Sequence, residues 1–402
     1  MNRHASIRLL IILLTALAAP ACGSDLAPPR DTGLTPVTLV PTHPAPTPTP
    51  SPERASVTLT PVQRLCSDDE VARILRDMPV YHPGGGAFVA LDADGFVIGG
   101  QRFVARGINY YPARSPWQRF PATSLPAIER DFAALKDVHV NTVRLFLWHE
   151  PMFVCPGNGA VPDLAAFDWL DALLRLASAY GFRVILTLNH LPDLTVQRLY
   201  TDQGEALAQT AYIVTRYRDE PAILAWDLRD AGDTDYTSLG DMPAPVTRAQ
   251  VLDWLARTAA AVREIDPNHL ITAGWANDSE ATISLVDVVS FQRFGDAETL
   301  RQRVAALRAL TDKPLLLIAF GYSTLAISDT EQAQQLRAAV RAAEGDRLAG
   351  WLVWTMYDFP TDVTCWPEPC ASLDDARHHY GLWRADGSRK PAANALETLA
   401  GQ

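Results

Sequence analysis

The sequence predicts an α/β protein whose folded part is a single (β/α)8 barrel of the TIM type. Short apolar runs, typical of buried parallel strands, alternate eight times with segments in which apolar residues recur at helical spacing. No Gly-rich phosphate-binding loop follows the first strand of this series, which argues against an open, doubly wound dinucleotide fold. Eight alternating units in one domain therefore favour a closed barrel.

The predicted elements begin with a β-hairpin. Residues 88–91 and 96–98 are strand-like, and the Asp-Gly pair in the turn between them favours a tight connection. We expect this hairpin to cap the bottom of the barrel. The eight predicted barrel strands are residues 103–108, 142–147, 183–188, 223–228, 270–273, 288–291, 315–320 and 350–355. The predicted helices are residues 128–138, 165–179, 205–217, 248–265, 280–285, 298–310 and 331–343, with a closing helix that begins near Pro391.

The residues before the barrel are predicted to export the protein and anchor it. Arg3 and Arg8 precede an apolar run, residues 9–19, that is too short to span a bilayer. Small residues then lead to Cys22, as in a bacterial lipobox, so residues 1–22 are expected to be a signal peptide with lipid added to Cys22. The protein would then be anchored to the membrane at the cell surface or the periplasmic face. Ala19 stands where the lipobox usually has Leu, so ordinary secretion is the alternative.

Residues 23–64 are predicted to be a tether, and residues 65–402 the barrel domain. The tether is rich in Pro and Thr, a composition that favours extended chain and cannot bury a core. The whole chain is 48% hydrophobic with a formal net charge of −11 and no basic run, so a nucleic-acid partner is not expected.

Four cysteines besides Cys22 lie in the exported part of the chain, where disulfides are stable. Three connectivities are possible. Cys365 and Cys370 share one Pro-containing loop, so we favour their pairing, which leaves Cys66 with Cys155; unpaired buried thiols are the alternative. No His lies at ligand spacing from the cysteine pair, so neither a metal nor another cofactor is expected.

Two predicted strands end in alanine and glycine. Residues 226–232 read Trp-Asp-Leu-Arg-Asp-Ala-Gly, and residues 319–321 read Ala-Phe-Gly. These segments resemble the strand-4 and strand-7 ends of clan A glycoside hydrolases, above all the cellulase and mannanase relatives of family 5, where the motifs run Trp-Glu/Asp-Leu-x-Asn-Glu-Pro and Glu-Phe-Gly. The resemblance places Ala231 at the position of the acid/base glutamate and Ala319 at that of the nucleophile.

The same resemblance assigns roles at two other strand ends. Arg144 matches the strand-2 arginine that supports the nucleophile in the family, and Trp354 matches the strand-8 tryptophan on which the sugar stacks. Each residue also has a structural interpretation. Arg144 would pair with a buried carboxylate to hold the barrel together, and Trp354 would fill the barrel mouth.

Several other strand ends depart from the family pattern. Asn189 followed by His190 stands where the family usually has His, Asp230 stands for the asparagine that bonds the sugar 2-hydroxyl, and Gln292 begins a Gln-Arg-Phe triplet in place of His-x-Tyr. Trp275 is a further aromatic residue expected at the mouth. The predicted sugar-binding set is Tyr110, Arg144, Trp148, Asn189, His190, Asp230, Gln292 and Trp354.

The two alanines decide which chemistry is expected. Retaining glycosidases use two carboxyl groups about 5–5.5 Å apart, and a methyl group can neither form the covalent intermediate nor transfer a proton. We therefore expect a catalytically degenerate barrel that binds an oligo- or polysaccharide. One alternative is an active, inverting glycosidase with relocated carboxylates, Asp230 being the best candidate; the other is a structural or protein-interaction barrel. The carboxylates considered for relocation are Glu150, Asp193, Asp227, Asp230, Asp233, Asp278, Asp296 and Asp358.

Overall fold

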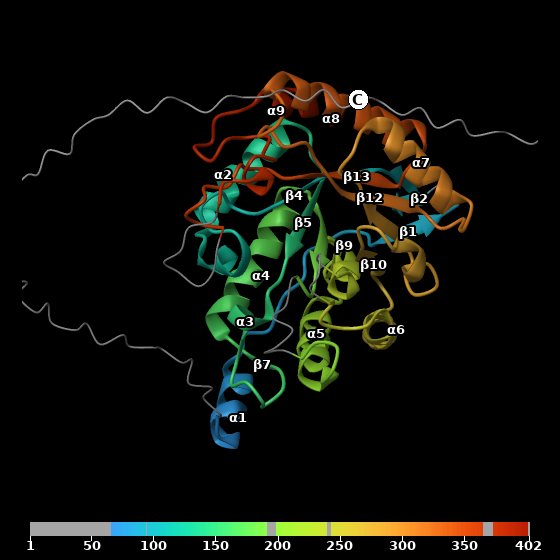
Figure 1. Ribbon diagram of the computed structural model, residues 1–402. Helices are drawn as coiled ribbons and strands as arrows, with labels where there is room; N and C mark the ends of the chain where they lie inside the picture. The colour runs from blue at the N-terminus through green and yellow to red at the C-terminus, as the bar shows by residue number, and fades with distance from the viewer. Residues whose placement is uncertain (1–65, 94, 191–197, 239–242, 365–372, 401–402) are drawn as a thin grey trace, which may run out of the picture. The chain divides into compact units, whose positions relative to one another are not determined.

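The computed structural model describes residues 66–93, 95–190, 198–238, 243–364 and 373–400 (Figure 1). Its centre is an eight-stranded sheet of parallel neighbours in the order β10-β9-β8-β5-β4-β13-β12-β11. Each strand therefore lies beside the next barrel strand along the chain, and the last pairs with the first. The strands are β4 (Ala105–Asn109), β5 (Thr142–Phe146), β8 (Arg183–Thr187), β9 (Ile223–Asp230), β10 (Leu270–Gly274), β11 (Val289–Gln292), β12 (Leu315–Phe320) and β13 (Gly350–Trp354).

The barrel closes between β10 and β11. A parallel backbone bridge joins Trp275, just beyond β10, to Phe291 on β11. The hydroxyl of Ser290 also donates to the carbonyl oxygen of Ala273 at 2.8 Å. These bonds complete the circle, so the (β/α)8 prediction is confirmed.

Helices cover the outside of the barrel, as expected (Figure 1). Side chains cap the first turns of four of these helices, and two of the four have full capping boxes, Thr247 with Gln250 and Ser328 with Glu331. The unit between β10 and β11 has only the 3-10 helix η3 (Ser279–Thr282) where a short helix was predicted. The α-helices around the barrel are α2 (Leu125–Asp137), α4 (Leu164–Ala179), α5 (Gln203–Tyr217), α6 (Arg248–Ile265), α7 (Ala297–Arg308), α8 (Asp329–Gly345) and α9 (Pro391–Ala400).

The predicted hairpin is present and gains a third strand. The antiparallel strands β1 (Val89–Asp92) and β2 (Gly95–Ile98) pair with each other, and β3 (Gln101–Phe103) pairs with β2. Phe103 therefore belongs to the cap and not to the first barrel strand, which corrects that boundary. Val89 and Phe96 pack in one cluster with residues of the barrel strands, so the hairpin does close one end of the barrel. The barrel residues of this cluster include Ala105, Ile185, Leu224, Leu316 and Leu352.

Cys66 and Cys155 form a disulfide, as predicted, with 5.3 Å between their Cα atoms. The preferred partner pair, Cys365 and Cys370, lies outside the described residues. The bond holds helix α1 (Asp68–Asp77), which has no buried side chain and packs near β7 (Val161–Pro162). Within the described ranges, no helix is both long and apolar enough to cross a membrane.

The remaining short elements lie in the connections between barrel units. They are α3 (His149–Met152), β6 (Phe153–Val154) and the 3-10 helices η1 (Trp117–Ala122), η2 (Gly232–Tyr236) and η4 (Ala376–His378). Two of them, η1 and α3, follow β4 and β5 and contribute side chains to the carboxyl end of the barrel, where active sites of such folds lie.

Candidate functional site

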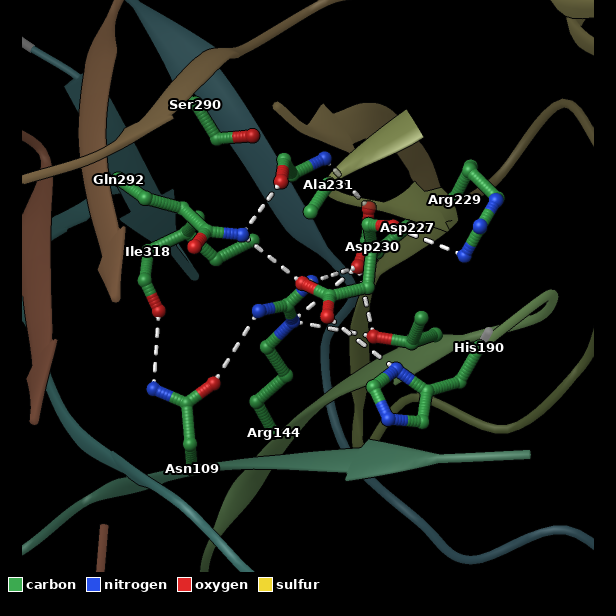
Figure 2. Close-up of polar contacts among 12 residues, drawn as sticks. Asn109, Arg144, His190, Asp227, Arg229, Asp230, Ala231, Ser290, Gln292 and Ile318 are labelled. Carbon is green, nitrogen blue, oxygen red and sulfur yellow. Dashed lines mark hydrogen bonds and ion pairs between the residues drawn. The ribbon is translucent and has the colours of Figure 1, made fainter. Parts of the chain in front are cut away.

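Arg144 lies at the centre of the carboxyl end of the barrel (Figure 2). Its Nη2 group donates to Asp230 Oδ1 at 2.8 Å and also to Asp227. Its Nε group bonds Thr187 Oγ1 at 3.0 Å, and Nη1 bonds Asn109 Oδ1 at 3.2 Å. The guanidinium is completely buried. It therefore joins β4, β5, β8 and β9, and the structural interpretation of Arg144 is the one that the contacts favour.

Asp227 and Asn109 complete this buried network. Asp227 accepts from the hydroxyl of Thr187 at 2.6 Å and from the backbone N–H of Gly274 at 2.8 Å. The amide of Asn109 donates to the carbonyl oxygens of Ile318 at 3.0 Å and Val353 at 3.2 Å. Strands β12 and β13 are thereby tied to the same centre.

Asp230 is the carboxylate that lies between this network and the mouth. It accepts from Arg144 and from Gln292 Nε2, the latter at 3.0 Å, and its residue is 9% exposed. Burial alone would raise its pKa, but Arg144, His190 and Arg229 outweigh burial and hold the pKa well below its usual range. Asp230 is therefore charged at neutral pH and does not supply the proton that a general acid must give.

Ala231 directly follows β9, and Ala319 lies on β12. Ala231 has left-handed backbone angles, φ 47° and ψ 38°, and its N–H donates to Gly274 O at 2.9 Å. That conformation costs a non-glycine residue about 1–2 kcal/mol. Ala319 is 1% exposed, and its register neighbour on β11 is Gln292. Neither position carries a group that can attack or protonate a glycoside.

Partly exposed tryptophans stand beside this polar centre. Trp354 stacks on Trp117, with ring centroids 6.3 Å apart and planes 8° from parallel, and meets Phe146 edge-on at 5.9 Å. The peptide bond that follows Trp354 is cis. Trp148 is also partly exposed, and its indole N–H donates to Tyr111 Oη at 3.1 Å. These indoles offer flat apolar faces of the kind that pyranose rings stack against.

Trp117 was missed by the sequence interpretation. It lies on η1, in the loop after the first barrel strand. Its position as an aromatic residue in a loop that leaves a strand end is the signal that could have identified it. Tyr110 and Trp275 were expected to be aromatic residues of the mouth, and in the structure both are completely buried. The Tyr110 hydroxyl donates to Asp131 Oδ2 on α2 at 2.7 Å, so it links the barrel to a helix.

Asn189 and His190 follow β8 and are almost completely buried. The Asn189 amide donates to Leu228 O at 3.1 Å, while its Oδ1 has no partner among the described residues. His190 Nδ1 lies 3.2 Å from Asp230 Oδ2, but the orientation falls short of a hydrogen bond, and Nε2 has no partner in the described part of the chain. The ring is surrounded by aromatic side chains, those of Tyr111, Trp117, Phe146 and Trp148.

Most other carboxylates considered for relocation have structural partners. Asp233 accepts from the backbone N–H groups of Ala276 and Asp278 at 3.0 and 2.9 Å. Asp278 pairs with Arg248, and Asp358 pairs with Lys390. Asp296 is the N-cap of α7, and Glu150 is exposed to solvent. Asp193 lies outside the described residues. Among the described residues, no three His, Cys, Asp or Glu side chains gather as metal ligands do.

His149, at the start of α3, is a second buried histidine near the mouth, and burial lowers its pKa to about 4 from 6.5. Between these values the unfolded chain binds a proton that the folded chain does not, so this group stabilises the fold above pH 6.5 and loses that effect as the pH falls. We expect it to remove up to about 3 kcal/mol of stability by pH 4. Denaturant melts of wild type and His149→Gln at each pH test this, with the exposed His82→Gln as the matched control. Equal slopes for wild type and His149→Gln would contradict it.

Comparison with known proteins agrees with this geometry. A family model described as cellulase, glycosyl hydrolase family 5, matches residues 101–288, a range that includes Ala231 but ends before Ala319 and Trp354. A mannan endo-1,4-beta-mannosidase F of Aspergillus clavatus is 25% identical over 48% of this chain and 47% of that protein. The chain spans about half the length of the curated relatives it matches first.

Solved structures with the same fold include two bacterial glycosidases. GH5_18 from Streptomyces cattleya, in complex with GlcNAc, has a TM-score of 0.63 at 20% identity, covering 75% of this chain and 80% of that one. The exo-beta-1,4-mannosidase Op5Man5 from Opitutaceae bacterium strain TAV5 has a TM-score of 0.63 at 22% identity, covering 78% and 62%. Fold and matched sequence together define a barrel of the glycoside hydrolase class. The chain is thus similar to the family 5-like proteins of clan A, in the matched residues 101–288 and in its fold.

Proposed function

We propose that this protein is a carbohydrate-binding barrel that does not hydrolyse glycosides. The observation that carries the proposal is the state of the carboxyl groups at the mouth. Alanine stands at positions 231 and 319, and Asp227 and Asp230 are both bound to Arg144. Because Asp230 is held in its charged form, it does not supply the acid of a carboxyl pair.

Retention of sugar binding is supported by the groups around the lost carboxylates. Trp354 and Trp117 stay partly exposed and nearly parallel, and Asp230 and Gln292 lie within the same mouth. Relatives with this fold are named as mannosidases, and one is described in complex with GlcNAc. We infer a β-1,4-linked hexose or hexosamine oligosaccharide as the ligand class. Weak affinity, in the micromolar-to-millimolar range, is enough for a surface protein that acts through many copies.

Binding of β-linked oligosaccharides to the purified barrel domain, residues 65–402, tests this proposal. We expect saturable heat of binding for at least one gluco-, manno- or hexosamine oligosaccharide, because a partly exposed indole pair gives a stacking surface without any catalytic group. A glycan array selects the candidates, and isothermal titration calorimetry measures the dissociation constant. Absence of any carbohydrate ligand on the array and in calorimetry would favour the structural or protein-interaction barrel.

A second candidate function rests on Asp230. It is the carboxylate of the central network that is not fully buried, so a relocated, inverting mechanism would have to use it. Such a mechanism needs a second carboxyl group about 6.5–9.5 Å away that can act on the opposite face of the sugar. The depressed pKa of Asp230 suits a base and not an acid, and Asp358, whose pKa burial raises, is bound to Lys390.

We further propose that the protein works outside the cytoplasm, held to a membrane by lipid on Cys22. The support is the sequence of residues 1–22 and the Pro/Thr-rich residues 23–64, which would hold the barrel away from the membrane surface. The Cys66–Cys155 disulfide fits an oxidising compartment. A single lipid-bearing residue and a long extended tether suit a barrel that captures polysaccharide near the cell.

Cys22→Ser should release the protein from the membrane fraction. Lipid attaches to the Cys22 sulfur, so the serine variant keeps the apolar run but has no acceptor for it. Detergent phase partition and mass spectrometry of the mature N-terminus measure the outcome. Ala21→Ser is a conservative control that keeps the sulfur, and it should partition as wild type does. A wild-type protein found wholly in the aqueous phase would contradict lipidation and favour ordinary secretion.

A further inference from the structure

The hydrogen-bond donors of the polar centre are already engaged by the protein. Gln292 Nε2 donates to Asp230 Oδ1 at 3.0 Å and to Gly274 O at 2.8 Å, which uses both of its hydrogens (Figure 2). Asn109 Nδ2 is likewise bound to two backbone carbonyls, and the Arg144 guanidinium bonds Asn109, Thr187 and both aspartates. These three groups are therefore not free to donate hydrogen bonds to a ligand.

The acceptors are not all engaged. Asn189 Oδ1 and His190 Nε2 are buried and have no hydrogen-bond partner among the described residues. His190 Nδ1 faces Asp230 Oδ2 at 3.2 Å, so Nδ1 is the nitrogen that carries the proton and Nε2 is left as an acceptor. An unpartnered buried acceptor costs about 1–3 kcal/mol unless a ligand or water donates to it. Asn189 Oδ1 and His190 Nε2 are therefore open to a donor on the ligand, while two unpartnered buried donors, Trp275 Nε1 and Arg293 Nε, lie just beyond the ends of β10 and β11.

The charge of the centre favours a positively charged ligand. Arg144 contributes one positive charge, and Asp227 and Asp230 contribute two negative ones within its bonding distance. Arg229 is matched separately by Asp235, at 2.8 Å. Burial lowers the pKa of His190, which keeps the ring neutral near pH 7. The centre is thus left with one net negative charge, in surroundings where solvent screens little.

These observations discriminate among sugars. A hydroxyl both donates and accepts, a carboxylate only accepts, and an ammonium group only donates and carries a positive charge. Indole faces such as those of Trp117 and Trp354 also attract cations. We propose that the preferred ligand is an amino sugar with a free ammonium group, a de-N-acetylated hexosamine unit, whose ammonium binds beside Asp230. This inference rests on the proposed carbohydrate binding and names its ligand class.

Calorimetry with four trisaccharides tests the inference. The probes are β-1,4-linked glucosamine, N-acetylglucosamine, mannose and α-1,4-linked galacturonate trimers, in phosphate buffer because Tris is itself an ammonium polyol. We expect the glucosamine trimer to bind wild type about tenfold more tightly than the two neutral trimers, as for a hydrogen bond to a charged group. The galacturonate trimer should bind least. The preference should weaken as ionic strength rises.

Two variants separate the role of Asp230 from general surface charge. Asp230→Asn should bring the glucosamine trimer to the affinity of the neutral trimers, whereas Glu150→Gln, an exposed carboxylate on α3, should keep the wild-type preference. If Asp230→Asn does not fold, the wild-type ranking and its salt dependence still decide. Equal or tighter binding of a neutral or galacturonate trimer, or a preference that survives in Asp230→Asn, overturns the inference while sugar binding stands. No binding of any trimer overturns the proposed function as well.

Discussion

The purified barrel should release no detectable sugar from β-1,4-mannan, β-1,4-glucan or aryl β-glycosides. Hydrolysis with retention needs a nucleophile and an acid/base, and alanine occupies both positions. Loss of general acid–base catalysis alone costs about 10²–10⁴ in rate, and loss of the nucleophile adds to it. Positioning by Trp354 and Arg144 leaves only residual catalysis. Reducing-end assays and release of nitrophenol, run beside an active family 5 enzyme, measure the rate.

Substitutions at the two alanines supply the matched controls. Ala231→Glu and Ala319→Glu each restore one role and should stay inactive, whereas the double variant should gain measurable hydrolysis because the surrounding strands keep the barrel register. Wild-type turnover comparable to ordinary glycosidases, abolished by Asp230→Asn, would establish the relocated-carboxylate mechanism instead. That result would also show that Asp230, with its depressed pKa, acts as the general base.

The alternation of strands and helices was predictable because most buried positions are apolar, and one boundary failed where the buried residues are polar. Strand β9 continues to Asp230, two residues beyond the prediction, since Asp230 pairs in register with Gly274. Arg229 and Asp230 are polar, so the apolar pattern ended before them. They are buried because Asp235, on the adjacent η2, and Arg144, on β5, neutralise them.

The site was predictable to the extent that it lies in short motifs. Ala231 and Ala319 could be placed because each belongs to a strand-end segment with recognisable neighbours. The burial of Tyr110 could not be predicted, because its partner Asp131 lies on helix α2. The sequence alone does not show how that helix packs against the barrel. The same holds for Arg144, whose charge is matched by two aspartates that β9 brings to it. Side-chain contacts between elements decided these cases.

On the proposal that Ala231 and Ala319 replace the two glutamates, this distribution of contacts explains how the barrel tolerates alanine there. In the family, the strand-2 arginine supports a glutamate; here Asp227 and Asp230 bind Arg144, so removing the glutamate leaves no unpaired buried cation. An uncompensated charge of that kind would cost several kcal/mol. The network is therefore complete without the nucleophile, and the fold does not depend on catalytic residues.

Trp354→Ala should remove most of the sugar affinity and leave the barrel folded. The indole is partly exposed and stacks on Trp117, so truncation removes the platform on which a pyranose would lie. We expect the dissociation constant to rise at least about tenfold, the size of effect typical of a central aromatic contact. The loss of stability should be smaller than for a buried tryptophan, because part of the ring already faces solvent. Calorimetry with the best oligosaccharide and thermal melts measure the two effects.

Trp351, three residues earlier on the same strand, is the matched control for packing. It is 1% exposed and meets Phe320 edge-on at 6.5 Å, so Trp351→Ala should cost about 3–5 kcal/mol of stability, as large core truncations do. Trp354→Phe should retain part of the affinity, because a smaller ring still stacks. If Trp354→Ala destabilises the barrel as much as Trp351→Ala does, Trp354 is core packing and the indole pair is not a binding surface. If it instead separates affinity from stability, ligand recognition at this mouth depends on aromatic stacking that outlasted the loss of both glutamates.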